Sequence, residues 1–234
     1  TAFLDRNRLV KMFTRYMVLS ESEKNLMVMR PYQVYATEAV VRRALETDKG
    51  GFVWHTTGSG KTLTSFKCAQ LLIKEPRIKK VIFLVDRSDL DNKTIEDFNT
   101  YEKDCVDMTE HTGVLIKQLK GKDKLIVSTI QKMSKAIKSS RYQKDIEAIK
   151  DDKVIFIFDE CHRSQAGSMH TDIERYFSHA QFFGFTGTPI FKENLGSGIK
   201  ITADLFGKCL HQYLISNAIA DRNVLGFSVE YIKT

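Results

Sequence analysis

The sequence has little of the residues that build disulfide-linked or membrane-spanning proteins. Its 234 residues include four cysteines, none of them in a C-x-x-C pair, and only three prolines. Scattered cysteines predict neither a disulfide framework nor a zinc site. No apolar run approaches the roughly 18 residues that cross a bilayer, and the first residues lack a signal-peptide pattern. We therefore expect a globular protein of the reducing cytoplasm, without a membrane partner.

The length and charge of the chain limit the folds and the partners that it can have. A chain of this size can bury a sizeable core, as one large α/β domain or as two small ones. Lysine and arginine total 36 against 29 aspartate and glutamate, which gives a formal charge of +7. An excess of this size is compatible with a polyanionic partner such as nucleic acid, but it does not demand one.

Short apolar segments alternate with amphipathic segments along the chain. The apolar ones cover residues 52–54, 81–85, 125–129, 154–158 and 182–186, and the amphipathic ones cover 63–73, 89–98, 130–137, 142–149 and 169–176. Buried parallel strands joined by crossover helices produce this alternation. The sequence predicts an α/β fold with a doubly wound, mostly parallel sheet and helices on both faces. Ligands of such sheets bind at the carboxyl ends of the strands.

The two ends of the chain are less informative. We expect one or two helices over residues 1–29, a helix over 211–220 and a strand over 227–232. Because the chain begins with Thr1 and stops within the last of these segments, we interpret it as part of a longer polypeptide.

Residues 55–62, HTTGSGKT, join a predicted strand to a predicted helix and are typical of a phosphate-binding loop. The two glycines let successive backbone N–H groups point into one concavity above the helix N-terminus. Lys61 would reach the β- and γ-phosphates, and the Thr62 hydroxyl would bind Mg²⁺. His55 stands where the general pattern has glycine. The sequence thus predicts a nucleoside triphosphate site formed by Thr57, Gly58, Ser59, Gly60, Lys61 and Thr62.

A second half of this site follows the apolar segment 154–158. Asp159 and Glu160 come directly after it. Asp159 would hold Mg²⁺ through water, and Glu160 would orient or deprotonate the water that attacks the γ-phosphate. A pair of acids at a strand end is the alternative, and a kinase or a switch GTPase could share both motifs in loose form. The adjacent glutamate favours an ATPase that hydrolyses, with Lys61 and Glu160 as catalytic residues.

Gln33 is a weaker candidate for the nucleotide site. It lies in the segment RPYQ, residues 30–33, upstream of the loop. An amide can pair with the donor and acceptor edge of adenine, so Gln33 could read the base, whereas an exposed helical glutamine is the alternative.

Taken in order, these motifs resemble the first RecA-like motor domain of superfamily 2 helicases and translocases, most closely the motor subunit of type I restriction enzymes. The similarity spans about residues 30–232, and the HTTGSGKT form, including its histidine, resembles motif I of the restriction subunits. The other matching segments are RPYQ at 30–33, LVDR at 84–87, STIQK at 128–132, DECHRSQ at 159–165 and GFTGTP at 184–189. The alternatives are another superfamily 2 helicase or repair translocase, and a DNA-binding module with a vestigial loop. The intact loop lysine and carboxylates argue against the vestigial loop.

The resemblance implies a domain organisation and a set of partners. It implies a lead-in over residues 1–29, a RecA-like ATP-binding motor domain over 30–212, and the passage to a second RecA-like domain over 213–234. Members use ATP and Mg²⁺ to translocate along double-stranded DNA, in a bacterial or archaeal complex with methyltransferase and specificity subunits, before a separate nuclease domain cuts. Hydrolysis in this family requires arginine fingers from the second RecA-like domain, and no Q-x-x-G-R-x-x-R pattern that would supply them occurs in this sequence. The chain alone is therefore expected to bind nucleotide at best weakly and to hydrolyse ATP poorly.

The resemblance also assigns roles outside the nucleotide loop. Arg87, Thr129 and Gln131 would approach phosphates of one DNA strand, which suits contacts that grip without reading sequence. Residues that would couple the γ-phosphate state to domain movement are His162, Thr186, Gly187 and Thr188. The alternatives are a surface arginine, a helix N-cap threonine and a turn at a strand end.

Overall fold

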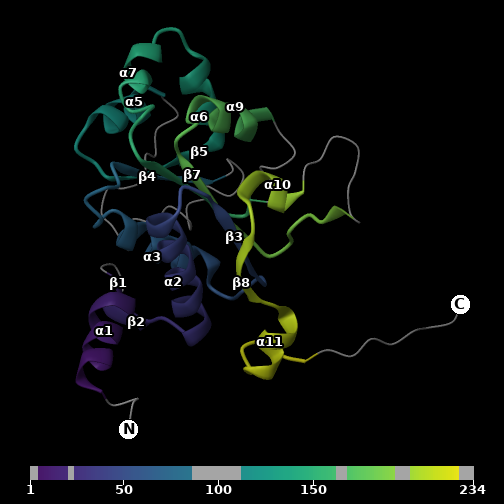
Figure 1. Ribbon diagram of the computed structural model, residues 1–234. Helices are drawn as coiled ribbons and strands as arrows, with labels where there is room; N and C mark the ends of the chain where they lie inside the picture. The colour runs from purple at the N-terminus through teal and green to yellow at the C-terminus, as the bar shows by residue number, and fades with distance from the viewer. Residues whose placement is uncertain (1–4, 21–23, 86–111, 162–167, 193–200, 227–234) are drawn as a thin grey trace, which may run out of the picture.

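The computed structural model describes residues 5–20, 24–85, 112–161, 168–192 and 201–226. Within these residues the centre is a six-stranded sheet in the order β5-β4-β6-β7-β3-β8 (Figure 1). Every neighbouring pair of strands in it is parallel. The strands are β3 (Gly51–His55), β4 (Lys80–Val85), β5 (Leu125–Thr129), β6 (Val154–Phe158), β7 (Gln181–Thr186) and β8 (Cys209–Tyr213). The predicted α/β fold with a parallel sheet is confirmed.

Helices cover both faces of the sheet, which makes three layers (Figure 1). Alternate residues of β4 face opposite ways: Val81 and Phe83 pack in one hydrophobic cluster, and Ile82 and Leu84 in another. The first cluster includes residues of α1 (Arg6–Tyr16), α2 (Pro31–Glu46) and α3 (Lys61–Leu72). The second includes residues of α5 (Thr112–Lys120), α6 (Ile130–Lys138), α7 (Gln143–Glu147), α9 (Ser168–Tyr176) and α10 (Thr202–Phe206). Strands buried on both faces explain the apolar runs of the sequence.

The helix predicted over residues 211–220 is wrong in its first part. Residues up to Tyr213 form β8, which pairs with β3, and only α11 (Ile215–Ala220) is helical. Backbone pairing at the sheet edge and burial of Tyr213, which is 4% exposed, outweigh the local amphipathic pattern.

The prediction of helices alone over residues 1–29 is also wrong in part. After α1 the chain forms an antiparallel pair, β1 (Met17–Ser20) and β2 (Asn25–Val28). Val18 and Ser20 are buried, whereas Leu19 between them is exposed. This alternation has the period of a strand, and the short run hid it within a generally apolar segment.

Some of the remaining predicted helices and strands fall within the described residues and can be compared with the structure, and others do not. The helix expected over 142–149 is shorter, at Gln143–Glu147, and those expected over 63–73, 130–137 and 169–176 agree with α3, α6 and α9. The helix predicted over 89–98 and the strand predicted over 227–232 lie outside the described residues. Among the helices that are described, none has the length and apolar character needed to span a membrane.

Candidate nucleotide-binding site

The loop between β3 and α3 has the backbone conformation that the motif predicts. Gly58 and Gly60 have positive φ angles of 77° and 74°, in the left-handed region that favours glycine. A Cβ atom at Gly58 would meet nothing within 4 Å, whereas one at Gly60 would lie 2.6 Å from Nε2 of Gln33. Gly60 is also the N-cap of α3, so the loop ends directly above the helix N-terminus. This arrangement presents backbone N–H groups to an anion.

The two halves of the predicted site meet at the carboxyl edge of the sheet. Lys61 Nζ lies 3.0 Å from Oε1 of Glu160, and the Lys61 side chain is only 6% exposed. The Thr62 hydroxyl donates to Oδ2 of Asp159 at 3.2 Å. These residues come from α3 and from the end of β6, so the fold brings together groups about a hundred residues apart in the sequence.

The acidic pair has a strained and electrostatically unfavourable environment. Burial, and secondly the neighbouring Glu160 carboxylate, raise the pKa of Asp159 from 3.8 to about 6, although Lys61 opposes the shift. Glu160 has a positive φ of 42°, which is uncommon for a residue with a side chain and concentrates at functional sites. A buried carboxylate beside a threonine hydroxyl offers the hard oxygen ligands that Mg²⁺ prefers. The residues present therefore fit a Mg²⁺ site.

The segment that follows β7 contacts the phosphate-binding loop. The indole N–H of Trp54 donates to the carbonyl of Gly187 at 3.1 Å. A Cβ atom at Gly187 would lie 3.4 Å from Oγ1 of Thr57, so a larger residue would crowd the loop. Thr186 is fully buried and its hydroxyl accepts the backbone N–H of Thr188 at 3.1 Å. Of the predicted coupling residues, Gly187 lies against the loop and Thr186 and Thr188 are hydrogen-bonded to each other on either side of it, whereas His162 lies outside the described residues.

The side chain of Gln33 contacts the backbone of the loop. Its Nε2 donates to the carbonyls of Ser59 at 3.0 Å and Gly60 at 3.4 Å, while its Oε1 accepts the N–H of Arg30 at 2.8 Å. The side chain is buried, so the expected alternative of an exposed helical glutamine is wrong. Reading adenine through this amide would require exchange of these hydrogen bonds, and that role stays a prediction.

The structure describes two of the three predicted DNA contacts, Thr129 and Gln131. Thr129 is buried, and its hydroxyl caps α6 by accepting the N–H of Lys132 at 3.2 Å. This is the N-cap role that we gave as its alternative. Gln131 is partly exposed in the first turn of α6. Arg87 lies outside the described residues.

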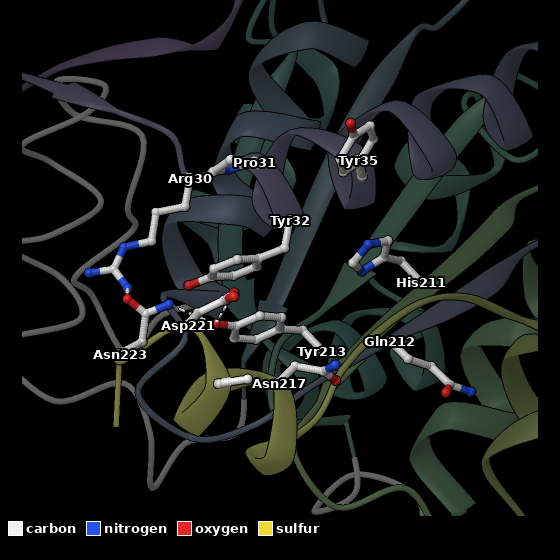
Figure 2. A pocket seen from close by; sticks show the side chains of 11 residues that line it. Arg30, Pro31, Tyr32, Tyr35, His211, Gln212, Tyr213, Asn217, Asp221 and Asn223 are labelled. Carbon is white, nitrogen blue, oxygen red and sulfur yellow. Dashed lines mark hydrogen bonds between the residues drawn. The ribbon is translucent and has the colours of Figure 1, made fainter. Parts of the chain in front are cut away.

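The first residue of the loop motif belongs to a ring cluster that the sequence did not reveal. His55 is fully buried, and its Nε2 lies 2.9 Å from Nδ1 of His211. Burial, and then the positive charges that His211 and Lys61 can carry, lower the pKa of His55 from 6.5 to about 3. The rings of Tyr32 and Tyr213 also contact His55 edge-on. A cavity of about 680 Å³ opens beside these tyrosines (Figure 2).

Comparison with known proteins identifies the family. Residues 32–234 match the SWI2/SNF2 ATPase family. The chain belongs to this family. The endonuclease subunit of the type I restriction enzyme SsaAORF53P from Staphylococcus saprophyticus is 57% identical, over 99% of this chain and 25% of the relative. The C-terminal part of the MpnIIP endonuclease subunit from Mycoplasma pneumoniae is 40% identical over 76% of this chain and 91% of that relative. The predicted kinship with endonuclease subunits of type I restriction enzymes is confirmed.

A solved structure supports the fold assignment. The ATP-dependent type ISP restriction-modification enzyme LlaBIII bound to DNA matches 85% of this chain and 16% of that chain, with a TM-score of 0.58 and 19% identity. At this identity the match shows the fold alone, and it confirms the predicted RecA-like, three-layer α/β domain. The chain spans about a quarter of the length of the first Staphylococcus relative.

Proposed function

We propose that this chain is the ATP-binding motor domain of a type I restriction endonuclease subunit, and that it powers translocation along double-stranded DNA before a separate nuclease domain cuts. The observation that carries the proposal is the convergence of Lys61 and Thr62 with Asp159 and Glu160 at one edge of the sheet. The family match and the restriction-enzyme relatives support it. They favour it over a repair translocase of the same superfamily.

In the proposed mechanism, each of the four residues has one role. Lys61 binds the β- and γ-phosphates, and the loop amides hold their remaining oxygens. Thr62 and Asp159 would hold Mg²⁺, which when bound neutralises phosphate charge. Glu160 accepts a proton from the attacking water, or orients that water.

The roles of the partner-contacting residues belong to the same proposal. Arg87, Thr129 and Gln131 contact phosphates of the DNA, and backbone contacts of this kind are independent of sequence. The TGTP segment and His162 transmit the γ-phosphate state. The methyltransferase and specificity subunits anchor the complex in a bacterial or archaeal cytoplasm. Residues 213–234 begin the passage to a second RecA-like domain, whose arginines complete the site, so the chain alone binds nucleotide weakly and hydrolyses it poorly.

Two substitutions in the complete subunit, assembled with its partner subunits, test the proposal. Lys61→Ala should abolish ATP-driven translocation, because the loop loses its main cation for the phosphates. Glu160→Gln should keep ATP binding and lose nearly all hydrolysis, because an amide cannot accept the proton of water. Lys74→Ala, at an exposed lysine just after α3, is the matched control. Translocation at the wild-type rate by Lys61→Ala would refute the motor assignment.

A further inference from the structure

Tyr32 and His55 attach one side of a ring cluster to the phosphate-binding loop. The Tyr32 hydroxyl donates to the carbonyl of Ser59 at 2.8 Å, within the loop. His55 is the last residue of β3 and leads directly into the loop, and the next residue, Thr56, donates its N–H to the carbonyl of Tyr213 at 2.9 Å. A shift of the loop backbone therefore cannot leave these rings where they are.

Tyr213 attaches the other side of the cluster to the segment after β8. The rings of Tyr32 and Tyr213 are stacked, with centroids 3.6 Å apart and planes inclined by 9°. The Tyr213 hydroxyl donates to Oδ2 of Asp221 at 3.0 Å and accepts from Nδ2 of Asn223 at 2.6 Å. Figure 2 shows the two rings face to face, with Asp221 and Asn223 at the hydroxyl of Tyr213. The second ring is thus anchored to the turn that follows α11.

Hydrogen bonds from the start of α2 close the network. The Arg30 guanidinium donates to Oδ1 of Asn223, and the Arg30 N–H donates to the amide oxygen of Gln33. Gln33 in turn holds the carbonyls of Ser59 and Gly60. The loop and the turn after α11 are therefore joined by two parallel routes, one through stacked rings and one through polar side chains.

The stacked contact is suited to movement. A face-to-face arrangement is not the preferred geometry of two aromatic rings, which favour an offset or an edge contact. Sliding one ring over the other therefore costs little, and the apolar area stays buried. The hydroxyls at the two ends are fixed to different segments, Ser59 on one side and the turn at 221–223 on the other. Displacement of either segment therefore changes the overlap of the two rings.

We propose that Tyr32, His55, His211 and Tyr213 form an aromatic clasp that couples the phosphate-binding loop to α11 and its turn. The inference rests on the proposed function, because it takes residues after β8 as the passage toward the second motor domain. The four are positioning residues: they act through Ser59 and the 221–223 turn, not on the phosphates. A nucleotide that displaces the loop thereby changes the mobility of the passage.

The test measures hydrogen exchange in the complete endonuclease subunit with and without a non-hydrolysable ATP analogue. In wild type, the analogue should slow exchange of the α11 amides, Ile215–Ala220, by at least about fivefold, the lower end of typical couplings between sites. Tyr32→Phe and Tyr213→Phe keep the stack but each cuts one anchor, so each should lose this response while the Kd for the analogue stays close to that of wild type. Tyr35→Phe removes the same hydroxyl from an exposed tyrosine on α2 and should respond like wild type.

Three results would overturn the clasp. The first is that the analogue slows α11 exchange in both anchor variants as it does in wild type. The second is that wild type binds the analogue but its α11 exchange does not change. The third is that the variants lose analogue binding, which would make the residues merely structural. ATP consumed per base pair translocated, measured on the same proteins in the assembled enzyme, should rise in the anchor variants. A wild-type enzyme that shows the exchange response but does not move DNA would refute the proposed function and leave the clasp standing.

Discussion

Replacing His55 with glutamine should flatten the dependence of stability on pH. His55 is fully buried, and its pKa is lowered from 6.5 to about 3, first by burial. In the unfolded chain the imidazole takes up a proton below about pH 6.5, whereas in the folded protein it stays neutral down to about pH 3. The unfolded state therefore binds more protons across this range, and the folded protein loses stability as the pH falls through it.

The size of the effect follows from the pKa shift. Each pKa unit is worth about 1.4 kcal/mol, so between about pH 7 and about pH 4 the free energy of unfolding should fall by about 3 kcal/mol through this one group. Asp159 has the opposite slope, because its pKa is raised to about 6 and the folded protein gains stability as that carboxylate is protonated. The two contributions offset each other over part of the range, so a single curve for wild type does not isolate either group.

The difference between wild type and variant isolates His55. Glutamine places an amide nitrogen where the imidazole Nε2 faces His211, and it does not titrate in this range. Urea unfolding at a series of pH values should show the wild type losing about 3 kcal/mol more than His55→Gln between about pH 7 and about pH 4. The same substitution at the exposed His179 controls for the change of residue type. Parallel curves for wild type and His55→Gln would refute the argument from burial.

Two further predictions concern the loop itself. Gly60→Ala should destabilise the chain by about 1 kcal/mol or more in thermal unfolding, because φ is 74° there and the new Cβ would lie 2.6 Å from an amide nitrogen. Gly226→Ala, where nothing lies within 4 Å, is its control, and equal melting temperatures would contradict the claim. ADP should shift the fluorescence of Trp54, the single tryptophan, because its indole bonds to Gly187 beside the loop. An unchanged emission spectrum under saturating ADP would contradict this coupling.

Local pattern was sufficient to predict most of the sheet and the meeting of the two halves of the candidate nucleotide site. The segments that became β4 (KVIFLV) and β6 (VIFIF) are almost entirely apolar and rich in β-branched residues, because helices bury both of their faces. Lys61 and Asp159 could be placed in one site because parallel strands end at the same edge, whatever their separation along the chain. These predictions required no knowledge of which strands are neighbours.

The features that local sequence pattern did not predict depend on contacts between segments that are far apart in the sequence. Residues Cys209–Tyr213 became a strand only because β3 offers an unpaired edge, which local periodicity cannot show. The hydrogen bond from Trp54 to Gly187 joins segments separated by 133 positions. The stacking of Tyr32 on Tyr213 depends on the same pairing of β8. The sequence offered one indication of this cluster, the closely spaced aromatic residues at 32 and 35 and at 211 and 213. An aromatic residue near a strand, however, more often packs in the hydrophobic core than links two segments.

The place of β3 in the sheet explains why its end carries three different contacts. The order β6-β7-β3-β8 sets β3 between the strand that precedes the TGTP segment and the edge strand. Successive side chains of a strand point to opposite faces, so Trp54 reaches Gly187 and His55 reaches His211, while Lys61 extends beyond them to Glu160. A glycine at position 55, as the general motif has, would leave the loop amides, Lys61 and the backbone pairing with β8 in place, but would remove the side-chain contact with His211. The departure from the motif therefore adds a side-chain contact between β3 and β8, beside the backbone pairing and the Tyr32 hydrogen bond that already join the loop to this edge of the sheet.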